Sequence, residues 1–280
     1  MKAQDLAMAL PESIRTSLSS NNPTWEHWGC CIACHKLLGY KEYAILGRTR
    51  KFRIHCDCEI EHDKQQRVIQ ERKARTLEVQ KIFNRLNLIP DSLTNAGFKN
   101  FQQREGSEKI YEIAKGFYRN FENEKFGYVF FGTPGNGKSH LARAVQRSLD
   151  ADGWPTLFLD WPKLSELARR SIKDERINLS AIVRAAIDVD LLVLDDIGTG
   201  WLTDFEFKNV AFPIINGRQN KKTLYTANLS PERLEAWFAS DKDGKALDED
   251  GRCIDRIIGD CKFVHNKATS MRRERARIID

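Results

Sequence analysis

The sequence predicts an α/β fold in which a parallel five-stranded sheet is covered by helices on both faces. Apolar runs suited to strands alternate with segments of helical periodicity from residue 91 to the end of the chain. Several of these runs, such as residues 191–194, are apolar throughout, which is typical of parallel strands buried on both faces. A glycine-rich turn joins the first run to the helix that follows it.

The expected elements succeed one another in a regular order. The expected strands are residues 128–131, 156–159, 191–194, 223–226 and 262–265. The expected helices are residues 106–121, the stretch from the glycine-rich turn to about residue 150, and residues 163–172, 176–188, 203–217, 231–239 and 252–258. Pro90 ends a preceding helical segment, so we place the start of the α/β domain at residue 91.

The glycine-rich turn has the GxxxxGK[ST] spacing of a phosphate-binding loop. It consists of Gly132, Thr133, Pro134, Gly135, Asn136, Gly137, Lys138 and Ser139, and His140 follows. The glycines let successive backbone N–H groups converge on phosphate oxygens at a helix N-terminus, where the helix dipole favours an anion. Lys138 supplies a positive charge for the β- and γ-phosphates, and the Ser139 hydroxyl is a ligand for Mg²⁺. The sequence therefore predicts binding of ATP or GTP.

Two carboxylates follow the third expected strand. Asp195 and Asp196 come directly after residues 191–194, at the carboxyl end where α/β sheets bind ligands. We expect Asp195 to hold Mg²⁺ and Asp196 to orient or deprotonate the attacking water. Paired aspartates are otherwise common as a helix cap or turn, but the phosphate loop favours the Mg²⁺ interpretation. Most ATPases with such a strand-end pair have glutamate at the second position, where this chain has Asp196. Because aspartate is shorter by one methylene group, we expect ATP hydrolysis to be slow or conditional.

Asn228 lies just beyond the next expected strand, residues 223–226. An uncharged amide at this place can hydrogen-bond the attacking water or the γ-phosphate, the role called sensor I. The same residue could instead cap the helix that begins at residue 231, and the two roles are compatible.

Cysteines near the N-terminus have a spacing that predicts a metal site. Cys31 and Cys34 are followed, after a gap of 21 residues, by Cys56 and Cys58. Four thiolates in two close pairs form the closed tetrahedral shell that structural Zn²⁺ prefers, and the aromatic and branched residues in the gap suit a small hairpin. Unligated or redox-active thiols are the alternative. Three neighbouring residues could replace one ligand: Cys30, His35 and His55.

These features give four predicted segments: an N-terminal arm at 1–24, a zinc-binding domain at 25–60, a charged connecting helix at 61–90 and the α/β domain at 91–280. The net charge of +6 permits a nucleic-acid partner without requiring one. No apolar run approaches the roughly eighteen residues of a membrane span, and the N-terminus has no signal-peptide pattern. We therefore expect a cytoplasmic protein with no membrane contact.

Four segments together resemble a known family. They are GTPGNGKS at 132–139, LLVLDDIG at 191–198, TLYTANLS at 223–230 and GRCIDR at 251–256. In this order and spacing they resemble the AAA+ ATPases that load replicative helicases, the DnaC/DnaI family, whose relatives include the transposition helper ATPases of the IstB kind. The cysteine cluster resembles that of the zinc-bearing loaders in particular.

The resemblance implies an AAA+ ATPase that uses ATP to load a hexameric DnaB-type helicase onto single-stranded DNA while assembled as a spiral oligomer such as a hexamer. It implies that Arg256 is an arginine finger for the nucleotide of the next subunit, with Arg252 as the alternative and an ordinary surface arginine as the other interpretation. Arg272 occupies a place resembling sensor II, although the helical lid that usually presents this residue is not expected here.

The interval between residues 160 and 191 resembles the insertion with which replication proteins of this kind contact single-stranded DNA. Interleaved acids favour an ordinary solvated face as the alternative. The cations that could follow phosphates are Lys163, Arg169, Arg170, Lys173 and Arg176.

Two other functions fit parts of the sequence. An IstB-like transposition helper shares the ATPase half, but the cysteine cluster argues against it. A P-loop kinase for a small metabolite could use Asp160 to bind its acceptor, but it needs an arginine-bearing lid that the sequence does not show.

Overall fold

The computed structural model describes residues 34, 38–45, 48–83, 86 and 88–271. The chain divides into two compact units, Met1–Gln70 and Glu71–Asp280, here called the N-terminal and C-terminal units. The predicted arm at 1–24 lies outside the described residues, as do Cys30, Cys31, His35 and Arg272.

The N-terminal unit contains the hairpin that the sequence predicts between the two cysteine pairs. Strand β1 (Tyr40–Ile45) pairs antiparallel with β2 (Arg48–Arg53). Helix α3 (Asp57–Phe83) begins within the Cys-x-Cys motif. Its first turn carries Asp57 and Glu59, which complement the positive end of the helix dipole.

Helix α3 crosses the boundary between the two units. Its last residues, including Val79, Ile82 and Phe83, pack against the core of the C-terminal unit, as does Leu86 beyond it. The compact C-terminal unit therefore begins at Glu71, and the domain start that we predicted at residue 91 falls after segments that belong to the same core. The sequence did not predict that α3 contributes to this core, because most of the helix is charged and only a few apolar residues in its last turns reach the core.

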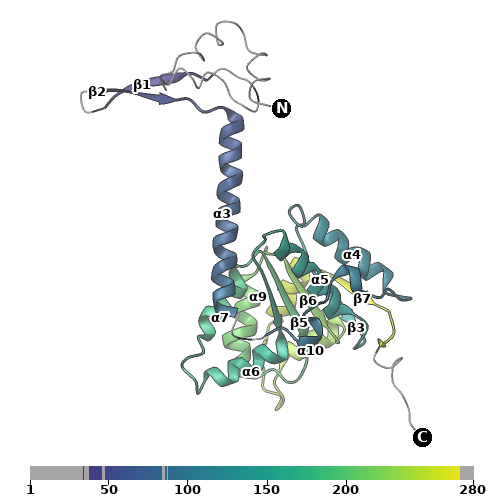
Figure 1. The fold of residues 1–280 in the computed structure, drawn as a ribbon. Coiled ribbons are helices and arrows are strands. Elements are labelled where there is room, and N and C mark those ends of the chain that lie inside the picture. The colour runs from purple at the N-terminus through teal and green to yellow at the C-terminus, as the bar shows by residue number, and fades with distance from the viewer. Residues whose placement is uncertain (1–33, 35–37, 46–47, 84–85, 87, 272–280) are drawn as a thin grey trace. The chain divides into compact units, whose positions relative to one another are not determined.

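The C-terminal unit is built on a five-stranded parallel sheet in the order β4-β5-β6-β3-β7. Its strands are β3 (Gly127–Gly132), β4 (Thr156–Asp160), β5 (Leu191–Ile197), β6 (Thr223–Ala227) and β7 (Cys261–Asn266). The strand that precedes the phosphate loop, β3, thus lies between β6 and β7, the two strands latest in the chain. The predicted parallel five-stranded sheet is confirmed, and Figure 1 shows its strands side by side.

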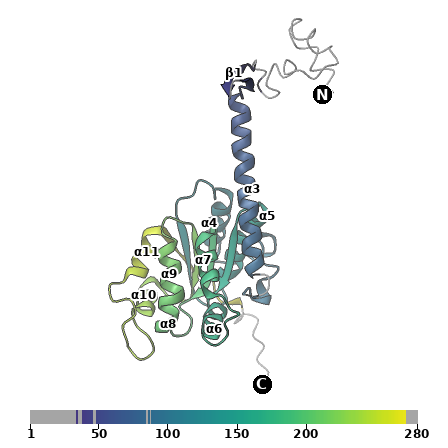
Figure 2. The same cartoon turned by 90° about the vertical axis from the view of Figure 1, so that its left-hand side faces the viewer.

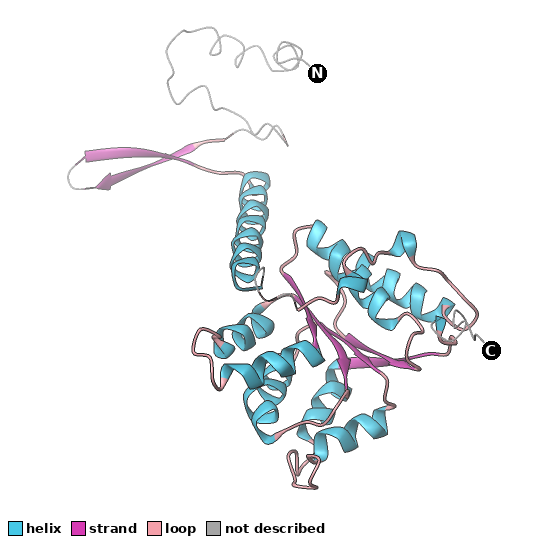
Figure 3. Cartoon of the chain, turned by 60° about the horizontal axis from the view of Figure 1, so that its bottom comes forward, coloured by secondary structure: helices cyan, strands magenta, loops and turns pink. Residues whose placement is uncertain are grey.

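Helices cover the sheet on both faces (Figure 3). On one face lie α4 (Glu108–Arg119) and α5 (Lys138–Ala151), together with the short helices η3 (Asp91–Leu93) and η4 (Phe98–Asn100). On the other lie α6 (Trp161–Ser171), α7 (Leu179–Asp188), α9 (Phe212–Gly217), α10 (Pro231–Ala239) and α11 (Arg252–Asp260). Figure 2 shows α9, α10 and α11 grouped next to one another.

Alternate residues of each strand feed the two cores. In β5, Leu191 and Val193 join the cluster under α4 and α5, whereas Leu192 and Leu194 join the cluster under α6 and α7. Successive side chains of a strand point to opposite faces, so a strand buried on both faces must be apolar at every position. This explains the continuous apolar runs in the sequence.

The helix predicted at 203–217 is interrupted by a turn of different pitch. The chain forms α8 (Asp204–Glu206), the π-helical turn η5 (Phe207–Ala211) and then α9. Pro213 stands in the first turn of α9, and it has no backbone N–H to donate to the preceding turn. The change of pitch therefore falls just before a position where the regular helical ladder lacks a donor.

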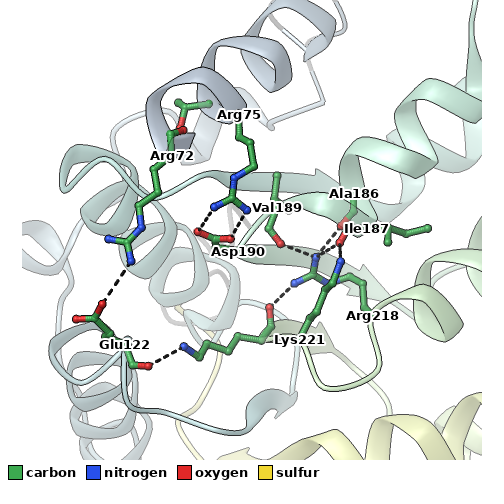
Figure 4. Close-up of polar contacts among 11 residues, drawn as sticks. Arg72, Arg75, Glu122, Ala186, Ile187, Val189, Asp190, Arg218 and Lys221 are labelled. Atoms are coloured by element: carbon green, nitrogen blue, oxygen red, sulfur yellow. Dashed lines mark hydrogen bonds and ion pairs between the residues drawn. The ribbon is translucent and has the colours of Figure 1, made fainter. Parts of the chain in front are cut away.

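A buried arginine joins the end of α7 to the start of β6. Arg218 is 2% exposed, and its Nη1 donates to the carbonyls of Ala186 (2.8 Å) and Val189 (2.9 Å). Nearby, Arg75 of α3 donates to Asp190 at 2.9 Å, and Figure 4 shows both arginines pointing into this region. The exposed Arg75 pair adds little stability, so the apolar packing of α3 matters more for its attachment.

Within the described residues, none of the helices combines the length and the apolar character that crossing a bilayer requires.

Candidate nucleotide-binding site

A cleft of about 510 Å³ opens at the carboxyl ends of the strands, around the glycine-rich loop. Residues from several separate parts of the chain line it: the segment before α4, the loop itself, and the ends of β4, β5 and β6 with the segment beyond β7. The lining includes Phe101, Pro134, Gly135, Asn136, Gly137, Lys138, Ser139, His140, Asp160, Asp195, Asp196, Asn228 and Met271. The structure therefore brings together the loop, the two aspartates and the asparagine that the sequence singled out.

Lys138 sits at the first turn of α5 and is 5% exposed. Its Nζ donates to the carbonyls of Gly132 and Thr133, both at 2.9 Å, and to Oδ1 of Asn136 at 3.0 Å. A fourth oxygen within hydrogen-bonding distance of the three ammonium protons is Oδ1 of Asn228, just beyond β6, at 3.0 Å. The ammonium group is thus held by neutral oxygens, which an anionic phosphate can replace with a stronger, charge-assisted contact.

Asn228 connects the loop to the acidic strand end. Its Oδ1 accepts from Lys138, and its Nδ2 donates to Oδ1 of Asp196 at 2.6 Å. Because the amide is at once an acceptor and a donor, it keeps the cation and the carboxylate at fixed positions on opposite sides. The N-cap of α10 is Ser230, so the side chain of Asn228 is engaged with Lys138 and Asp196 and does not cap this helix.

Asp195 is buried in the centre of the site, with 2% of its surface exposed. Burial, together with the neighbouring Asp196 and Asp160, raises its pKa to about 6. Hydrogen bonds from Thr226 and Ser139 act in the opposite direction and lower the pKa. A buried carboxylate whose charge is stabilised by two hydroxyls is a suitable ligand for a divalent cation.

The backbone turns sharply at the two aspartates. The pairing of β5 with β6 shifts register between Leu194 and Ile197, and Asp196 has a φ of 57°. Such irregularities bend a strand and re-aim its side chains. Here the irregularity places Asp195 beside Thr226 and Asp196 beside Asn228.

A third carboxylate, Asp160, faces the same cleft from the end of β4. It caps α6 by accepting from the backbone N–H of Lys163 at 3.0 Å. Burial raises its pKa, and the nearby charge of Asp196 adds to the effect. Asp160 therefore has a structural role as a cap and also adds negative charge to the cation site.

The last residue of β7, Asn266, and the segment after it hold the glycine-rich loop in place, a role that the sequence did not reveal. Asn136 donates to the carbonyl of Asn266 at 3.0 Å, and Asn266 donates back to the carbonyl of Asn136 at 2.9 Å. Met271 N–H donates to the carbonyl of Gly135 at 3.0 Å. Gly132 has a φ of 137°, and a Cβ there would lie 2.5 Å from the carbonyl oxygen of Asn266, so the close approach requires glycine.

The segment before α4 also contributes to the lining of the cleft. Phe101 stacks on Tyr111 with ring centroids 5.6 Å apart and meets the edge of His140 at 5.4 Å. A Cβ on Gly137, whose φ is 98°, would lie 2.7 Å from the Phe101 ring. His140 is in turn held by the backbone of Gly97 at 2.9 Å. Aromatic rings that line a pocket commonly contact the base of a bound nucleotide. No motif in the sequence predicted that Phe101, which lies well before the glycine-rich loop, would line this cleft.

Arg252 and Arg256 lie on α11, and neither lines the cleft of its own chain. Each guanidinium carbon lies 5.3 Å from the ring centre of Phe212. Both residues line a separate, open depression of about 490 Å³ on another part of the surface. The structure therefore places both arginines outside the cleft of their own chain, and the assignment of a finger stays a prediction.

The cations of the interval between β4 and β5 are largely engaged within the chain. Lys163 donates to the carbonyl of Ile89 at 3.0 Å, and Arg169 donates to the fully buried Glu206 at 2.9 Å. Arg176 pairs with Asp174 at 2.8 Å. These contacts favour the alternative that we kept open, a solvated face, for three of the five cations that the sequence singled out.

Three of the four predicted zinc ligands lie within the described residues. The sulfur atoms of Cys34, Cys56 and Cys58 lie within 4.8 Å of one another. The Glu59 N–H donates to the Cys56 sulfur at 3.4 Å, at the N-terminus of α3, where the dipole favours a thiolate. Tetrahedral zinc sites require such a cluster, so the residues present fit the ion.

A family model for IstB-like ATP binding proteins matches residues 60–278. The chain belongs to the IstB-like ATP-binding protein family. The match includes the glycine-rich loop, both aspartates and Asn228, so the chain is an AAA+ ATP-binding protein.

Curated relatives of this IstB-like protein include helicase loaders. The replicative helicase loader DnaC of Escherichia coli (strain K12) is 26% identical over 166 residues, which cover 59% of this chain and 66% of DnaC. The uncharacterized protein YdaV of the same strain is 33% identical over 128 residues, which cover 45% of this chain and 51% of YdaV. The chain thus spans less than two thirds of the length of these relatives. The predicted relation to the DnaC/DnaI family is confirmed.

Solved structures share the fold of the IstB-like domain. The DnaC helicase loader superposes with a TM-score of 0.51 and 24% identity, over 64% of this chain and 100% of that one. DnaI gives 0.52 and 21% identity, over 65% and 93%. The replication initiator DnaA bound to AMPPCP and single-stranded DNA gives 0.51 and 22% identity, over 65% and 52%. The predicted AAA+ fold is therefore confirmed.

Proposed function

We propose that this protein is an ATPase that loads a replicative hexameric helicase of the DnaB type onto single-stranded DNA. The observation that carries the proposal is the cleft in which a phosphate-binding loop, two acidic strand-end residues and Asn228 converge. The relation to DnaC supports the choice of a helicase as the object of this chemistry.

ATP would lie with its phosphates against residues 132–139 and its base toward Phe101 and His140. The backbone N–H groups of the loop and the N-terminus of α5 would bind the phosphate oxygens, and Lys138 would exchange its neutral acceptors for phosphate. Phe101 and His140 both line the cleft and supply the aromatic rings that would contact the base.

Asp195 and Ser139 would hold Mg²⁺, which when bound neutralises charge on the phosphates. The fit rests on a buried carboxylate whose pKa is raised by burial and by neighbouring acids. Asp196 would accept a proton from the attacking water or orient it, and Asn228 would hold that water or the γ-phosphate. Because Asp196 is shorter than the usual glutamate, hydrolysis would be slow in the isolated subunit.

Hydrolysis would be completed by a neighbouring copy of the chain. Arg256, or Arg252 one turn earlier, would reach the γ-phosphate of the next subunit and stabilise charge in the transition state. Both arginines lie away from the cleft of their own chain, as a contribution in trans requires. Successive subunits would form a spiral around the DNA.

The cysteine cluster would bind Zn²⁺ through Cys34, Cys56 and Cys58, with Cys31 as the fourth ligand. Zinc would supply a rigid cross-link between the hairpin and the start of α3, which a two-stranded hairpin needs because it is marginally stable alone. The chain before the C-terminal unit would hold the helicase.

A transposition helper ATPase is the second candidate, since the matching family model is IstB-like. Such a protein would use the same cleft but would associate with a transposase. The predicted cysteine domain at 25–60 ends where the region matched by the family model begins, at residue 60. Because the zinc-bearing loaders have such a cysteine cluster, this domain favours the loader.

Co-elution with a purified DnaB-type helicase tests the proposal. A complex should form with ATP and weaken with ADP, and Lys138→Ala should remove the nucleotide dependence. If no complex forms in either nucleotide state, the loader function is wrong. Nucleotide-dependent binding to a transposase in place of the helicase would favour the second candidate.

A further inference from the structure

The two faces of the β1–β2 hairpin differ in charge. The hairpin carries five lysines and arginines against one glutamate. It also exposes large rings, since Tyr43 is 51% and Phe52 is 45% exposed. The hairpin precedes residue 60, so it lies outside the region matched by the family model.

The strand register assigns residues to the faces. Lys41 lies opposite Phe52 and Tyr43 lies opposite Arg50, and opposed residues share a face of an antiparallel pair. The rings of Tyr43 and Phe52 meet edge to face with centroids 5.7 Å apart, which confirms that these two share one face. Arg48, two positions before Arg50, belongs to this face as well. We call Lys41, Tyr43, Arg48, Arg50 and Phe52 the aromatic–basic face.

The opposite face has a different character. There Lys51 contacts Glu42 at 3.5 Å and the Tyr40 hydroxyl at 3.3 Å, and its ammonium lies 4.4 Å from the Tyr40 ring centre. The one glutamate of the two strands therefore lies on this second face and is paired with its lysine. The aromatic–basic face carries three cations and no acid in its two strands.

We propose that the aromatic–basic face binds single-stranded nucleic acid. Exposed rings offer stacking surfaces to unpaired bases, and cations beside them neutralise the phosphates that join those bases. A duplex keeps its bases stacked internally, so the rings would gain little from it. A protein partner would need several acids to match three cations with no acid among them, whereas a single strand supplies a phosphate for each cation and a base for each ring.

The face has the dimensions for a few nucleotides. Six residues per strand extend over about 20 Å, and the cations lie on both sides of the ring pair. Stacking on each ring and contact of each cation with a phosphate then act together along one strand of nucleic acid. This site adds a contact for the DNA partner of the proposed function and rests on that function only for the choice of DNA as the probe.

Binding of fluorescein-labelled oligo(dT) to the full-length protein, followed by anisotropy without nucleotide, tests this site. Tyr43→Ala combined with Phe52→Ala should weaken binding by about fivefold to a hundredfold per ring. Lys41→Ala combined with Arg50→Ala should reduce the slope of log K against log salt by about 1.4 for two lost phosphate contacts. Duplex DNA of equal length should bind the unmodified protein more weakly.

Tyr40→Ala and Lys51→Ala are the matched controls, since they change the same residue types on the opposite face. They should leave oligo(dT) binding unchanged. Tyr43→Phe should retain binding because it keeps the ring. Circular dichroism and thermal unfolding of each variant check that the hairpin changes do not unfold the protein.

Other outcomes would overturn this assignment. If alanine variants of both faces lose oligo(dT) binding equally, net charge alone binds the DNA. Loss only with Arg170→Ala and Lys173→Ala would place the DNA on the C-terminal unit. Loss of helicase binding with unchanged oligo(dT) binding would show a protein-docking face. Helicase co-elution and ATP turnover are measured in parallel, so a failure here is distinguishable from a failure of the loader function.

Discussion

The Thr226 hydroxyl donates a 2.5 Å hydrogen bond to Oδ1 of Asp195. The hydroxyl oxygen of Thr226 also accepts the backbone N–H of Asp196 at 2.8 Å, so one side chain on β6 fixes both acidic residues of β5. Thr226 is itself 1% exposed and cannot turn toward water. It is therefore a positioning residue for the cation site.

Thr226→Val should lower Mg²⁺-dependent ATP turnover by about tenfold to a hundredfold, because a hydrogen bond to a charged group in a buried site is lost. The valine has nearly the volume of threonine, so packing should change little. Thr226→Ser retains the hydroxyl and should retain turnover. Equal turnover in the valine and serine variants would contradict the positioning role.

The pH dependence of turnover should report Asp195. Its pKa is raised to about 6, so the ionised form is lost as pH falls through about 6, and kcat/KM should fall there. The folded protein holds this proton more tightly than the unfolded chain, so ionisation of Asp195 destabilises the protein without Mg²⁺ as pH rises from about 4 to 6. Thr226→Val removes a bond that favours the charged form and should move the acid limb to higher pH. If the acid limb of the pH profile stays at the same pH in Thr226→Val, the limb reports the ionisation of another group.

Lys138→Ala should abolish nucleotide binding, because the loop loses the cation that pairs with the β- and γ-phosphates. Isothermal titration with a nonhydrolysable ATP analogue measures the effect. Lys115→Ala is the control, since this lysine lies on α4 outside the cleft. Retained affinity in the Lys138 variant would mean that the loop does not bind the phosphates.

Arg256→Ala should preserve ATP binding but remove hydrolysis. Mixing it with Lys138→Ala offers a direct test of a contribution in trans: the first variant supplies an intact cleft and the second supplies an intact arginine. Turnover should reappear on mixing only if the arginine acts between subunits. Arg252→Ala, treated in the same way, determines which of the two is the finger, and full turnover by assembled Arg256→Ala would exclude Arg256.

Asn266→Ala should destabilise the protein by about 1–3 kcal/mol, because the Asn136 carbonyl loses its buried donor, Asn266 Nδ2, and the Ala268 N–H loses its acceptor, Asn266 Oδ1. Differential scanning calorimetry should show a lower Tm, by about 2–4 °C for each kcal/mol. Asn123→Ala is the control, since its bond to Asn120 is exposed and 3.3 Å long. Equal Tm values for the two variants would contradict the role of Asn266, at the end of β7, in holding the glycine-rich loop.

Zinc should copurify with the full-length protein and be lost on Cys56→Ser or Cys58→Ser. Elemental analysis measures the metal directly. Cys261→Ala should retain it, since this thiol is buried in the C-terminal unit and burial raises its pKa to about 12. A protein that contains no zinc would favour unligated or redox-active thiols.

Several of the features above depend only on residues adjacent in the chain, and the sequence was sufficient for them. The glycine-rich turn between a strand and a helix at residues 132–139 and the apolar runs of the strands were predicted correctly in place, whereas β5 continues past the predicted end at residue 194, through both aspartates, to Ile197. A motif of this kind is recognisable because backbone geometry within one turn or one strand follows from neighbouring residue types.

Other contacts depended on the order of the strands. Asn136 meets Asn266 across 130 residues, and Thr226 meets Asp195 across 31, because the sheet places β3 beside β7 and β5 beside β6. The approach of Phe101 to Gly137 and the packing of the last turns of α3 on the core are of the same kind. No local pattern encodes these pairs, since hydrophobic burial selects them only when the whole sheet and its helices assemble.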